Sequence, residues 1–284
     1  MSEPRELPAH IQAQLASAGR ETDTGGQPWE GRDLGEGTSH THGYPDDDGR
    51  TPAPVAEALE KFARAELPEE GVVAALAGTR LFAPILAEVS RTELTEDGLV
   101  SDKEADMSLV SISAPDGRKA LPVFTRVDAL TDWHPQARPV AADARKTALA
   151  AVEDGNQLMV VNPGAELTFV LRRPALWALA KGEQWLPSYS DPRVQAALEA
   201  CAAADPLIAS VGMTPGRGVA SRDAEGRMLP GGGPGPELSI ELGVRPGLDR
   251  AALDAAVTAF QERLRADDVV AERVDSMELR LRPA

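Results

Sequence analysis

The chain has 284 residues, of which 42% are hydrophobic, and its 45 acidic residues outnumber its 29 basic ones, giving a formal net charge of −16. This balance counts against nucleic acid and anionic membrane surfaces as partners, because both are bound through Lys and Arg. A single cysteine excludes an internal disulfide, the amino end lacks the apolar core of a signal peptide, and no apolar run approaches the length that spans a bilayer. We therefore expect a cytoplasmic globular protein of one large or two small domains.

Residues 1–54 differ in composition from the rest of the chain. They are rich in glycine, proline and acidic residues and poor in large apolar ones. Such a segment buries too little surface to offset roughly 1–2 kcal/mol of backbone entropy per residue, so we predict a disordered acidic tail. The tail contains His10, His40 and His42. Alternating histidines in a mobile segment bind metal weakly, so we expect no metal site.

Residues 55–186 are expected to form the first folded domain. The i, i+4, i+7 spacing of apolar residues predicts an amphipathic helix over residues 55–67. A strand is expected over residues 80–89, in which Pro84 indicates an edge position or a bulge.

A β-hairpin is predicted next. Residues 107–113 and 120–124 read as two strands, joined by Pro115-Asp116-Gly117-Arg118. Proline at the first turn position and glycine at a later one suit a tight turn, which supports this interpretation.

Beyond the hairpin, helices and strands are expected to alternate. Thr125 is expected to cap a short helix that ends near Trp133, and a longer helix is expected over residues 141–154. Residues 157–161 are almost wholly apolar, which is typical of a strand covered on both faces. The further elements expected in this domain are a turn at Asn162-Pro163-Gly164, a strand at 167–171 and a helix at 174–181.

These segments resemble the amino-terminal domain of the SseB (enhanced serine sensitivity) family. In that family a strand ending in Phe-Thr leads into a short helix closing on Trp, and a later buried strand ends in Asn-Pro-Gly. The residues that carry the resemblance are Leu121-Pro122-Val123-Phe124-Thr125, Leu130, Trp133 and Val160-Val161-Asn162-Pro163-Gly164. The resemblance covers roughly residues 56–181. It implies a small α/β domain of bacterial cytoplasmic proteins, with no established reaction, cofactor or catalytic residue.

Residues 187–284 are expected to form a second, α+β domain. Asp191 caps a predicted helix, and the period-two alternation over residues 238–244 and 277–281 predicts two half-buried strands. One amphipathic helix between these strands suggests an antiparallel unit with the helix on one sheet face. The element order loosely resembles the carboxyl-terminal domain of some SseB family members. The expected architecture is thus α/β (α+β): two small mixed-sheet domains with helices packed on the sheets.

Few residues suggest chemistry. Asp132-Trp133-His134 places the only histidine of the predicted folded region beside a carboxylate, but no Ser or Cys nucleophile is near, which favours a surface histidine at a helix end. Asn162 ends a buried strand where α/β sheets often bind ligands, although a tight turn also explains it. We therefore name Trp133, His134 and Asn162 as candidate contacts to a ligand or partner, and no catalytic, cofactor-binding or metal-ligating residue.

Two further features have structural explanations. Cys201 lies on the apolar stripe of its predicted helix, so it is expected to be a small buried hydrophobe. The glycines of residues 226–235 lack the spacing of a phosphate-binding loop, and interspersed prolines remove backbone donors, so we expect a flexible loop and no cofactor.

Two classes of function remain open. The first is a non-catalytic protein-binding or regulatory module with a protein partner. The alternative is a small-molecule sensor or enzyme with a pocket between residues 124–134 and 162–164. The absence of a catalytic constellation leans against an enzyme. The binding module predicts that these two segments lie far apart or pack without a cavity. The alternative predicts a shared cleft containing His134 and a carboxylate with a perturbed pKa.

Overall fold

Buried apolar side chains in the computed structural model gather in two large clusters, one within residues 55–185 and one within residues 194–274. The structure describes residues 44, 47–87, 107–114, 116–218 and 235–284. Residues 46–284 form one unit, in which helices pack on mixed and antiparallel sheets. The α+β prediction is confirmed, and the domain boundary between residues 186 and 187 stays a prediction.

The first part of this unit contains two sheets, with strand orders β2-β1-β5 and β3-β4-β6-β7. An isolated backbone bridge between Phe82 and Phe124 joins them. β4 and β6 are parallel, and the other described pairs of these sheets are antiparallel. The strands are β1 (Arg80–Ala87), β2 (Met107–Leu109), β3 (Ile112–Ser113), β4 (Lys119–Val123), β5 (Arg138–Asp143), β6 (Leu158–Val161) and β7 (Phe169–Leu171).

Helices cover these sheets. The larger core packs apolar faces of α2, α3, α5 and α6 against strand residues such as Leu121 and Met159. A smaller cluster packs Leu130 of α4 against Phe82 and Phe124. The apolar run of β6 is explained by its place between β4 and β7, where Leu158, Met159 and Val161 are fully buried. The helices are α2 (Ala53–Ala63), α3 (Glu69–Leu76), α4 (Val127–Trp133), α5 (Ala144–Glu153) and α6 (Arg173–Lys181).

The predicted hairpin is confirmed in its second half. β3 pairs with β4 across a turn in which Gly117 has a φ of +84°, and the Ala114 amide donates to the Arg118 carbonyl at 2.8 Å. The predicted strand 107–113 divides in two, because Met107–Leu109 pairs with β1 instead.

The prediction that Pro84 marks an edge position or a bulge is wrong. β1 pairs with β2 on one side and β5 on the other, and neither described pairing has a register shift. The Phe82 amide donates to the Phe124 carbonyl. Because backbone groups two residues apart point to the same side of a strand, the nitrogen of Pro84 also faces the side of β1 on which Phe124 lies. On that side the neighbour changes from Phe124 to β2, whose pairing begins at Ile85. The N–H group that Pro84 lacks would therefore lie between the Phe82–Phe124 bridge and the β1–β2 pairing, where its absence breaks neither of them.

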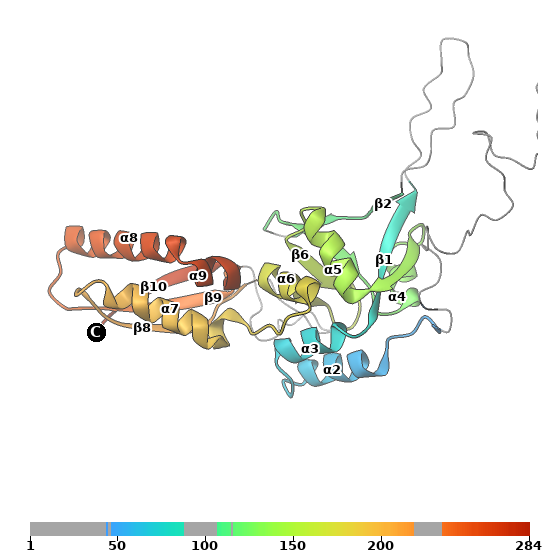
Figure 1. Ribbon diagram of the computed structural model, residues 1–284, viewed down its shortest axis with the longest axis horizontal. Coiled ribbons are helices and arrows are strands. Elements are labelled where there is room, and N and C mark those ends of the chain that lie inside the picture. The colour runs from blue at the N-terminus through green and yellow to red at the C-terminus, as the bar shows by residue number, and fades with distance from the viewer. Residues whose placement is uncertain (1–43, 45–46, 88–106, 115, 219–234) are drawn as a thin grey trace, which may run out of the picture. The chain divides into compact units, whose positions relative to one another are not determined.

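The second part contains a three-stranded sheet of order β10-β9-β8, with α7, α8 and α9 packed over it (Figure 1). β8 and β9 are antiparallel, but β9 and β10 are parallel, so the expectation of a wholly antiparallel unit is wrong. The chain crosses over through α8 and α9, which returns it in the same direction. The elements are η1 (Ser188–Ser190), α7 (Pro192–Ala203), β8 (Ile208–Pro215), β9 (Leu238–Val244), α8 (Arg250–Ala266), α9 (Asp268–Arg273) and β10 (Met277–Pro283).

Candidate functional site

The parallel pairing of β4 and β6 brings two segments of the predicted site to the same sheet edge. Both strands end there, β4 leading into Phe124 and β6 into Asn162. Beside these ends lies a cavity of about 180 Å³, which we call the hollow. Its lining residues are Arg126, Ala129, Asp132, Trp133, Pro163, Gly164 and Ala165. The two segments that the sequence analysis singled out as pocket walls therefore lie side by side around a cavity, and the expectation that they lie far apart or pack without a cavity is wrong.

Asn162 does not line the hollow. Its side-chain Oδ1 accepts a hydrogen bond from the Thr125 amide at 2.8 Å, and its Nδ2 donates to Thr125 Oγ1 at 3.0 Å. Its φ of +53° lies in the left-handed region, which asparagine tolerates better than most residues. The buried Asn162 side chain therefore ties the end of β6 to the end of β4.

Thr125 connects this pair to residues near the amino end of the described unit. The expectation that Thr125 caps α4 is wrong, because the residue at the cap position is Arg126, and its side chain makes no capping bond. The Thr125 hydroxyl lies 2.8 Å from the Thr51 hydroxyl, and its carbonyl accepts from Arg80 Nη1 at 2.5 Å. The polar groups of Thr125 are thus engaged within the fold.

Arg80 is 4% exposed and forms an ion pair with Asp47. Its Nη2 donates to Asp47 Oδ1 at 2.7 Å and to the Arg50 carbonyl at 2.5 Å. The hydrogen bond from Arg80 lowers the pKa of Asp47 below its usual value of 3.8. These contacts place residues 47–51, which belong to the segment predicted as tail, against the sheet. Ala53 and Pro54 begin α2, and residues 1–43, 45 and 46, including His10, His40 and His42, lie outside the described residues.

Trp133 and His134 occupy different positions relative to the hollow. The half-buried Trp133 forms part of its lining, and its ring centroid lies 5.4 Å from that of Phe124. His134 does not line the hollow; its Nδ1 is buried and has no hydrogen-bond partner among the described residues. Among the described residues, no hydrogen bond joins His134 to Asp132. The Asp132-Trp133-His134 segment therefore brings only its first two side chains to the hollow.

Carboxyl groups with clearly raised pKa values lie elsewhere. Burial raises the pKa of Glu69, at the start of α3, to about 7, and burial also raises the pKa of Glu237, just before β9. The Glu237 carboxylate accepts from the amides of Ser188 and Asp275 at 3.4 and 3.0 Å. Neither glutamate lines the hollow. The sequence analysis missed this buried acidic pair, because its members are far apart in the chain and carry no local pattern.

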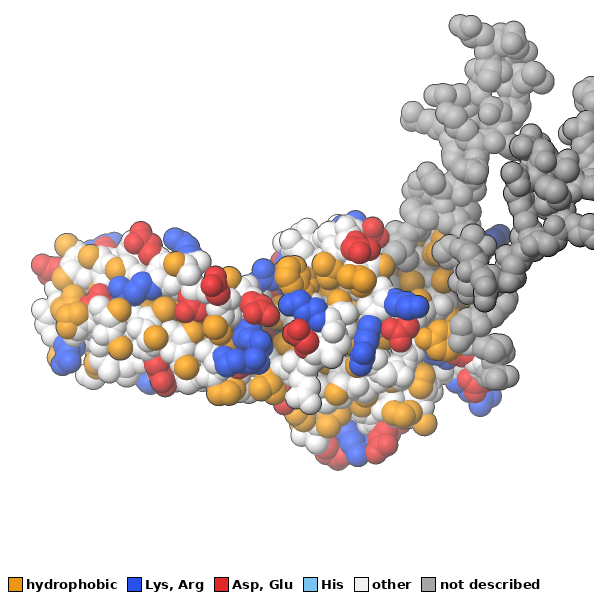
Figure 2. Space-filling model, in the orientation of Figure 1, with side chains coloured by type: hydrophobic (Ala, Val, Ile, Leu, Met, Phe, Trp, Pro, Cys, Tyr) orange, Lys and Arg blue, Asp and Glu red, His pale blue; other side chains and the backbone are white. Residues whose placement is uncertain are grey.

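Charges on the visible surface are mixed. Figure 2 shows Lys and Arg side chains interspersed with Asp and Glu on that face, without one large region of a single sign. Cys201 is buried in the second core, and burial raises the pKa of its thiol, in agreement with its expected role as a small hydrophobe. Among the described helices, none combines the length and apolar composition needed to traverse a bilayer.

Comparison with known proteins identifies one domain. No curated protein and no solved structure matches the chain. Residues 55–178 match the family model of the SseB protein N-terminal domain. This range contains the ends of β4 and β6 and the residues that line the hollow, among them Trp133. The resemblance of residues 187–284 to a family carboxyl-terminal domain stays a prediction. Residues 55–178 are therefore an SseB N-terminal domain.

Proposed function

We propose that this chain is a non-catalytic protein-binding or regulatory module, and that the hollow is a contact surface for a protein partner. The observation that carries the proposal is the internal use of the polar groups at the ends of β4 and β6. Asn162, Thr125 and Arg80 bond to one another or to residues 47–51. What remains open at this edge is a small hollow beside an indole ring.

The size and lining of the hollow fit a side chain of a partner better than a metabolite. Its volume of about 180 Å³ is below the roughly 300–1,000 Å³ of pockets that enclose drug-sized ligands. Trp133, Pro163 and Ala165 supply apolar surface, and Arg126 and Asp132 supply one charge of each sign. A partially buried aromatic with a charged rim is typical of protein interfaces. The proposal includes the cytoplasmic location expected from the sequence. It also includes the expectation that neither nucleic acid nor a membrane is the partner.

Affinity capture from the source cells tests this proposal. The bait is the full chain, compared with Arg126→Glu, which reverses the charge at the hollow, and with Arg138→Glu on β5 as the matched exposed control. We expect one protein species to be retained by the wild type and by Arg138→Glu and to be lost with Arg126→Glu. Capture that is the same for all three baits, or no specific capture, contradicts the proposal. The same bait without residues 1–43, which keeps Asp47 and the start of α2, tests whether the acidic segment recruits the partner.

The alternative, a small-molecule sensor or enzyme, makes a different prediction. Its pocket would lie between residues 124–134 and 162–164, where the hollow is. A metabolite that raises the melting temperature of the wild type but not of His134→Ala would favour it. We expect no such compound, because His134 does not line the hollow and the glutamates with raised pKa lie away from it.

A further inference from the structure

The outer edge of β10 has no neighbouring strand in the described part of the chain, because β10 is the first strand of the β10-β9-β8 order. The Ser276 carbonyl accepts from the Leu238 amide at 3.0 Å, which fixes the alternation of backbone groups along β10. Even-numbered residues direct their N–H and C=O groups toward β9, so those of Met277, Leu279 and Leu281 point outward. This edge is therefore open to another strand.

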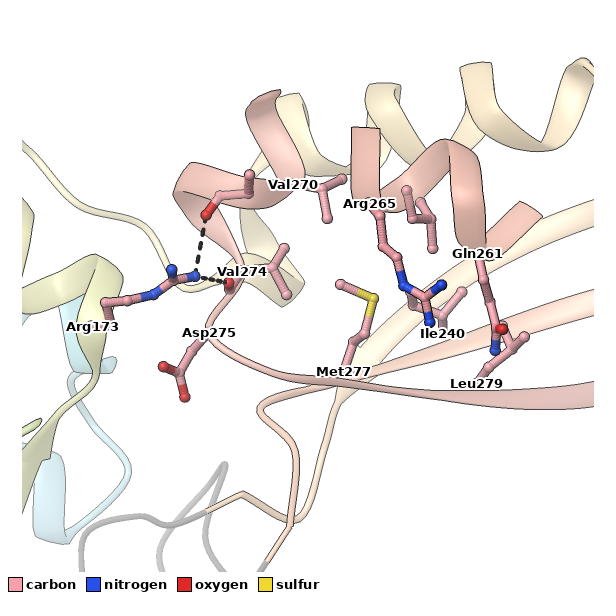
Figure 3. Close-up of a pocket in the computed structure, with 11 residues that line it drawn as sticks. Arg173, Ile240, Gln261, Arg265, Val270, Val274, Asp275, Met277 and Leu279 are labelled. Atoms are coloured by element: carbon pink, nitrogen blue, oxygen red, sulfur yellow. Dashed lines mark hydrogen bonds between the residues drawn. The ribbon is translucent and has the colours of Figure 1, made fainter. Parts of the chain in front are cut away.

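The same three residues form an apolar row on the helix-covered face of the sheet. Met277 is 39% and Leu281 45% exposed, which is unusual for large apolar side chains on a strand's inner face. A groove of about 470 Å³ lies beside the row, between β10 and helices α8 and α9. Figure 3 shows Gln261 and Arg265 extending from α8 toward the strand, with Met277 between the helices and the sheet. The helices thus leave the β10 row partly uncovered.

We propose that a second copy of this chain binds at the β10 edge, with the two strands antiparallel and Leu279 opposite Leu279 of the second copy. Each outward-pointing residue then faces another one, and such pairs exchange both N–H···O bonds. In this register Met277 lies opposite Leu281 of the second copy, and the reverse. The two most exposed members of each row therefore cover each other, and the two sheets become one continuous sheet.

Charge complementarity selects this register. On the opposite face, Glu278 lies across from Arg280 of the second copy, and symmetry repeats the pair. Shifting one strand by two residues moves the centre of the pairing to Arg280 or to Glu278. Arg280 then lies opposite Arg280, or Glu278 opposite Glu278, and like charges directly opposite each other destabilise a sheet. The register centred on Arg280 also places Glu278 opposite Arg282, but it adds the Arg280–Arg280 pair. Only the register centred on Leu279 therefore brings opposite charges together without a like-charged pair.

A second hollow lies where the strand of the second copy would continue. In the proposed register Arg282 of the second copy lies opposite Ser276. Ser276 lines an open cavity of about 540 Å³ beside β10, which contains three acidic residues and one basic one. These charged residues are Asp116, Asp275, Glu278 and Arg118. The cavity therefore has room for the incoming Arg282 side chain. Its acids already pair within the chain, Asp116 and Asp275 with Arg118 and Glu278 with Arg280, so its volume rather than its charge supports this placement.

Sedimentation equilibrium of the full chain tests the proposal independently of the hollow at Trp133. We expect a reversible monomer–dimer equilibrium, weakened at least about tenfold by Leu281→Lys. Leu149→Lys on α5 is the matched control, because Leu149 is exposed to a similar degree and lies on another element, and it should leave the equilibrium unchanged. A monomer at all concentrations up to millimolar, or a dimer insensitive to Leu281→Lys, overturns the proposal.

A charge exchange tests the register. Glu278→Arg and Arg280→Glu should each weaken self-association by roughly tenfold, because each variant places like charges at both cross-strand sites. A mixture of the two variants should associate as tightly as the wild type, since each site again holds one acid and one base. A mixture that associates no more tightly than either variant alone overturns the proposed register.

Discussion

Two regions of the sheets, the carboxyl ends of β4 and β6 and the outer edge of β10, use their polar and apolar groups in opposite ways. At the ends of β4 and β6, the side chains of Asn162, Arg80 and Asp47 are bonded within the fold. At the edge of β10, backbone groups point outward and the apolar side chains of Met277 and Leu281 are exposed. Polar residues in the first region therefore maintain the structure, whereas the second region is available for association.

This contrast shows that residue type alone is a poor guide to function. Asn162 sits at the end of a buried strand, where ligands often bind, yet its amide holds the adjacent segment in place. The alternating residues of β10 read as an ordinary half-buried strand, yet their inner face is partly open. Three substitutions test this difference, and one tests the buried Glu69 for comparison. They are given in order of decreasing expected change in stability.

The first substitution, Asp47→Ala, removes the partner of a buried guanidinium. Because Arg80 is 4% exposed, its unpaired charge should cost about 4 kcal/mol of unfolding free energy. The measurement is urea denaturation of the full chain. Asp48→Ala is the control, since the Asp48 side chain bonds only the exposed Arg50 amide among the described residues, and it should cost less than 1 kcal/mol. Equal effects of the two substitutions would show that the ion pair does not hold residues 47–51.

The second substitution concerns the pH dependence of stability. The pKa of Glu69 is raised from 4.5 to about 7, so the folded protein holds this proton more tightly than the unfolded chain. The contribution of Glu69 is fully present below pH 4.5 and is lost as the pH rises through 7. Glu69→Gln should therefore unfold less readily than the wild type at pH 8, by on the order of 2–3 kcal/mol, and match it near pH 4.

Glu70→Gln provides the control for this pH effect, because Glu70 is the next residue of α3 and is only half-buried. The charge of Glu70 makes the smallest of the contributions that raise the pKa of Glu69, so Glu70→Gln should change the pH dependence of stability much less than Glu69→Gln does. The explanation by burial fails if Glu69→Gln and the wild type keep a constant difference from pH 4 to pH 8.

The third substitution, Asn162→Gly, separates the backbone of this position from its side chain. Glycine accepts a φ of +53° but leaves the buried Thr125 amide without its acceptor, at a cost of about 1–2 kcal/mol. Asn162→Ala should cost about 1 kcal/mol more, because alanine is strained in the left-handed region. Equal unfolding free energies of the two variants would contradict a conformational role for this residue.

The smallest change in stability is expected at the open edge. Leu281→Lys should alter the unfolding free energy of the monomer by less than about 0.5 kcal/mol, because the side chain is 45% exposed. Thermal and urea denaturation at dilute concentration measure this. A loss as large as that of Asp47→Ala would mean that the row packs within the fold and is unavailable to a second copy.

Much of the fold follows from local patterns. Alternation over residues 238–244 and 277–281 predicted β9 and β10, and the Pro-Asp-Gly turn predicted the β3–β4 hairpin. β5 was missed because most of its residues are exposed and its Arg138-Pro139-Val140 start lacks a strand pattern. The parallel direction of β10 was missed because it depends on how α8 and α9 cross the sheet, which no short window of sequence contains.

The candidate site could be predicted only in part. The Phe-Thr and Asn-Pro-Gly segments were named as walls of one pocket under the alternative function, and the structure brings them to the same sheet edge. The inward orientation of Asn162 and the contacts of Asp47 could not be predicted, because they depend on pairings between residues far apart in the chain. The groove and open row beside β10 were also missed, since the pattern shows which side chains face the helices but not how far the helices reach.

The central claim is that the ends of β4 and β6 hold the fold through Asn162 while the adjoining hollow binds a partner. Measuring both unfolding free energy and partner capture for Asn162→Gly and Arg126→Glu tests it most directly. We predict that Asn162→Gly loses stability but, below its melting temperature, still captures the partner, whereas Arg126→Glu keeps its stability and captures nothing. If folded Asn162→Gly loses the partner and Arg126→Glu retains it, the account is contradicted.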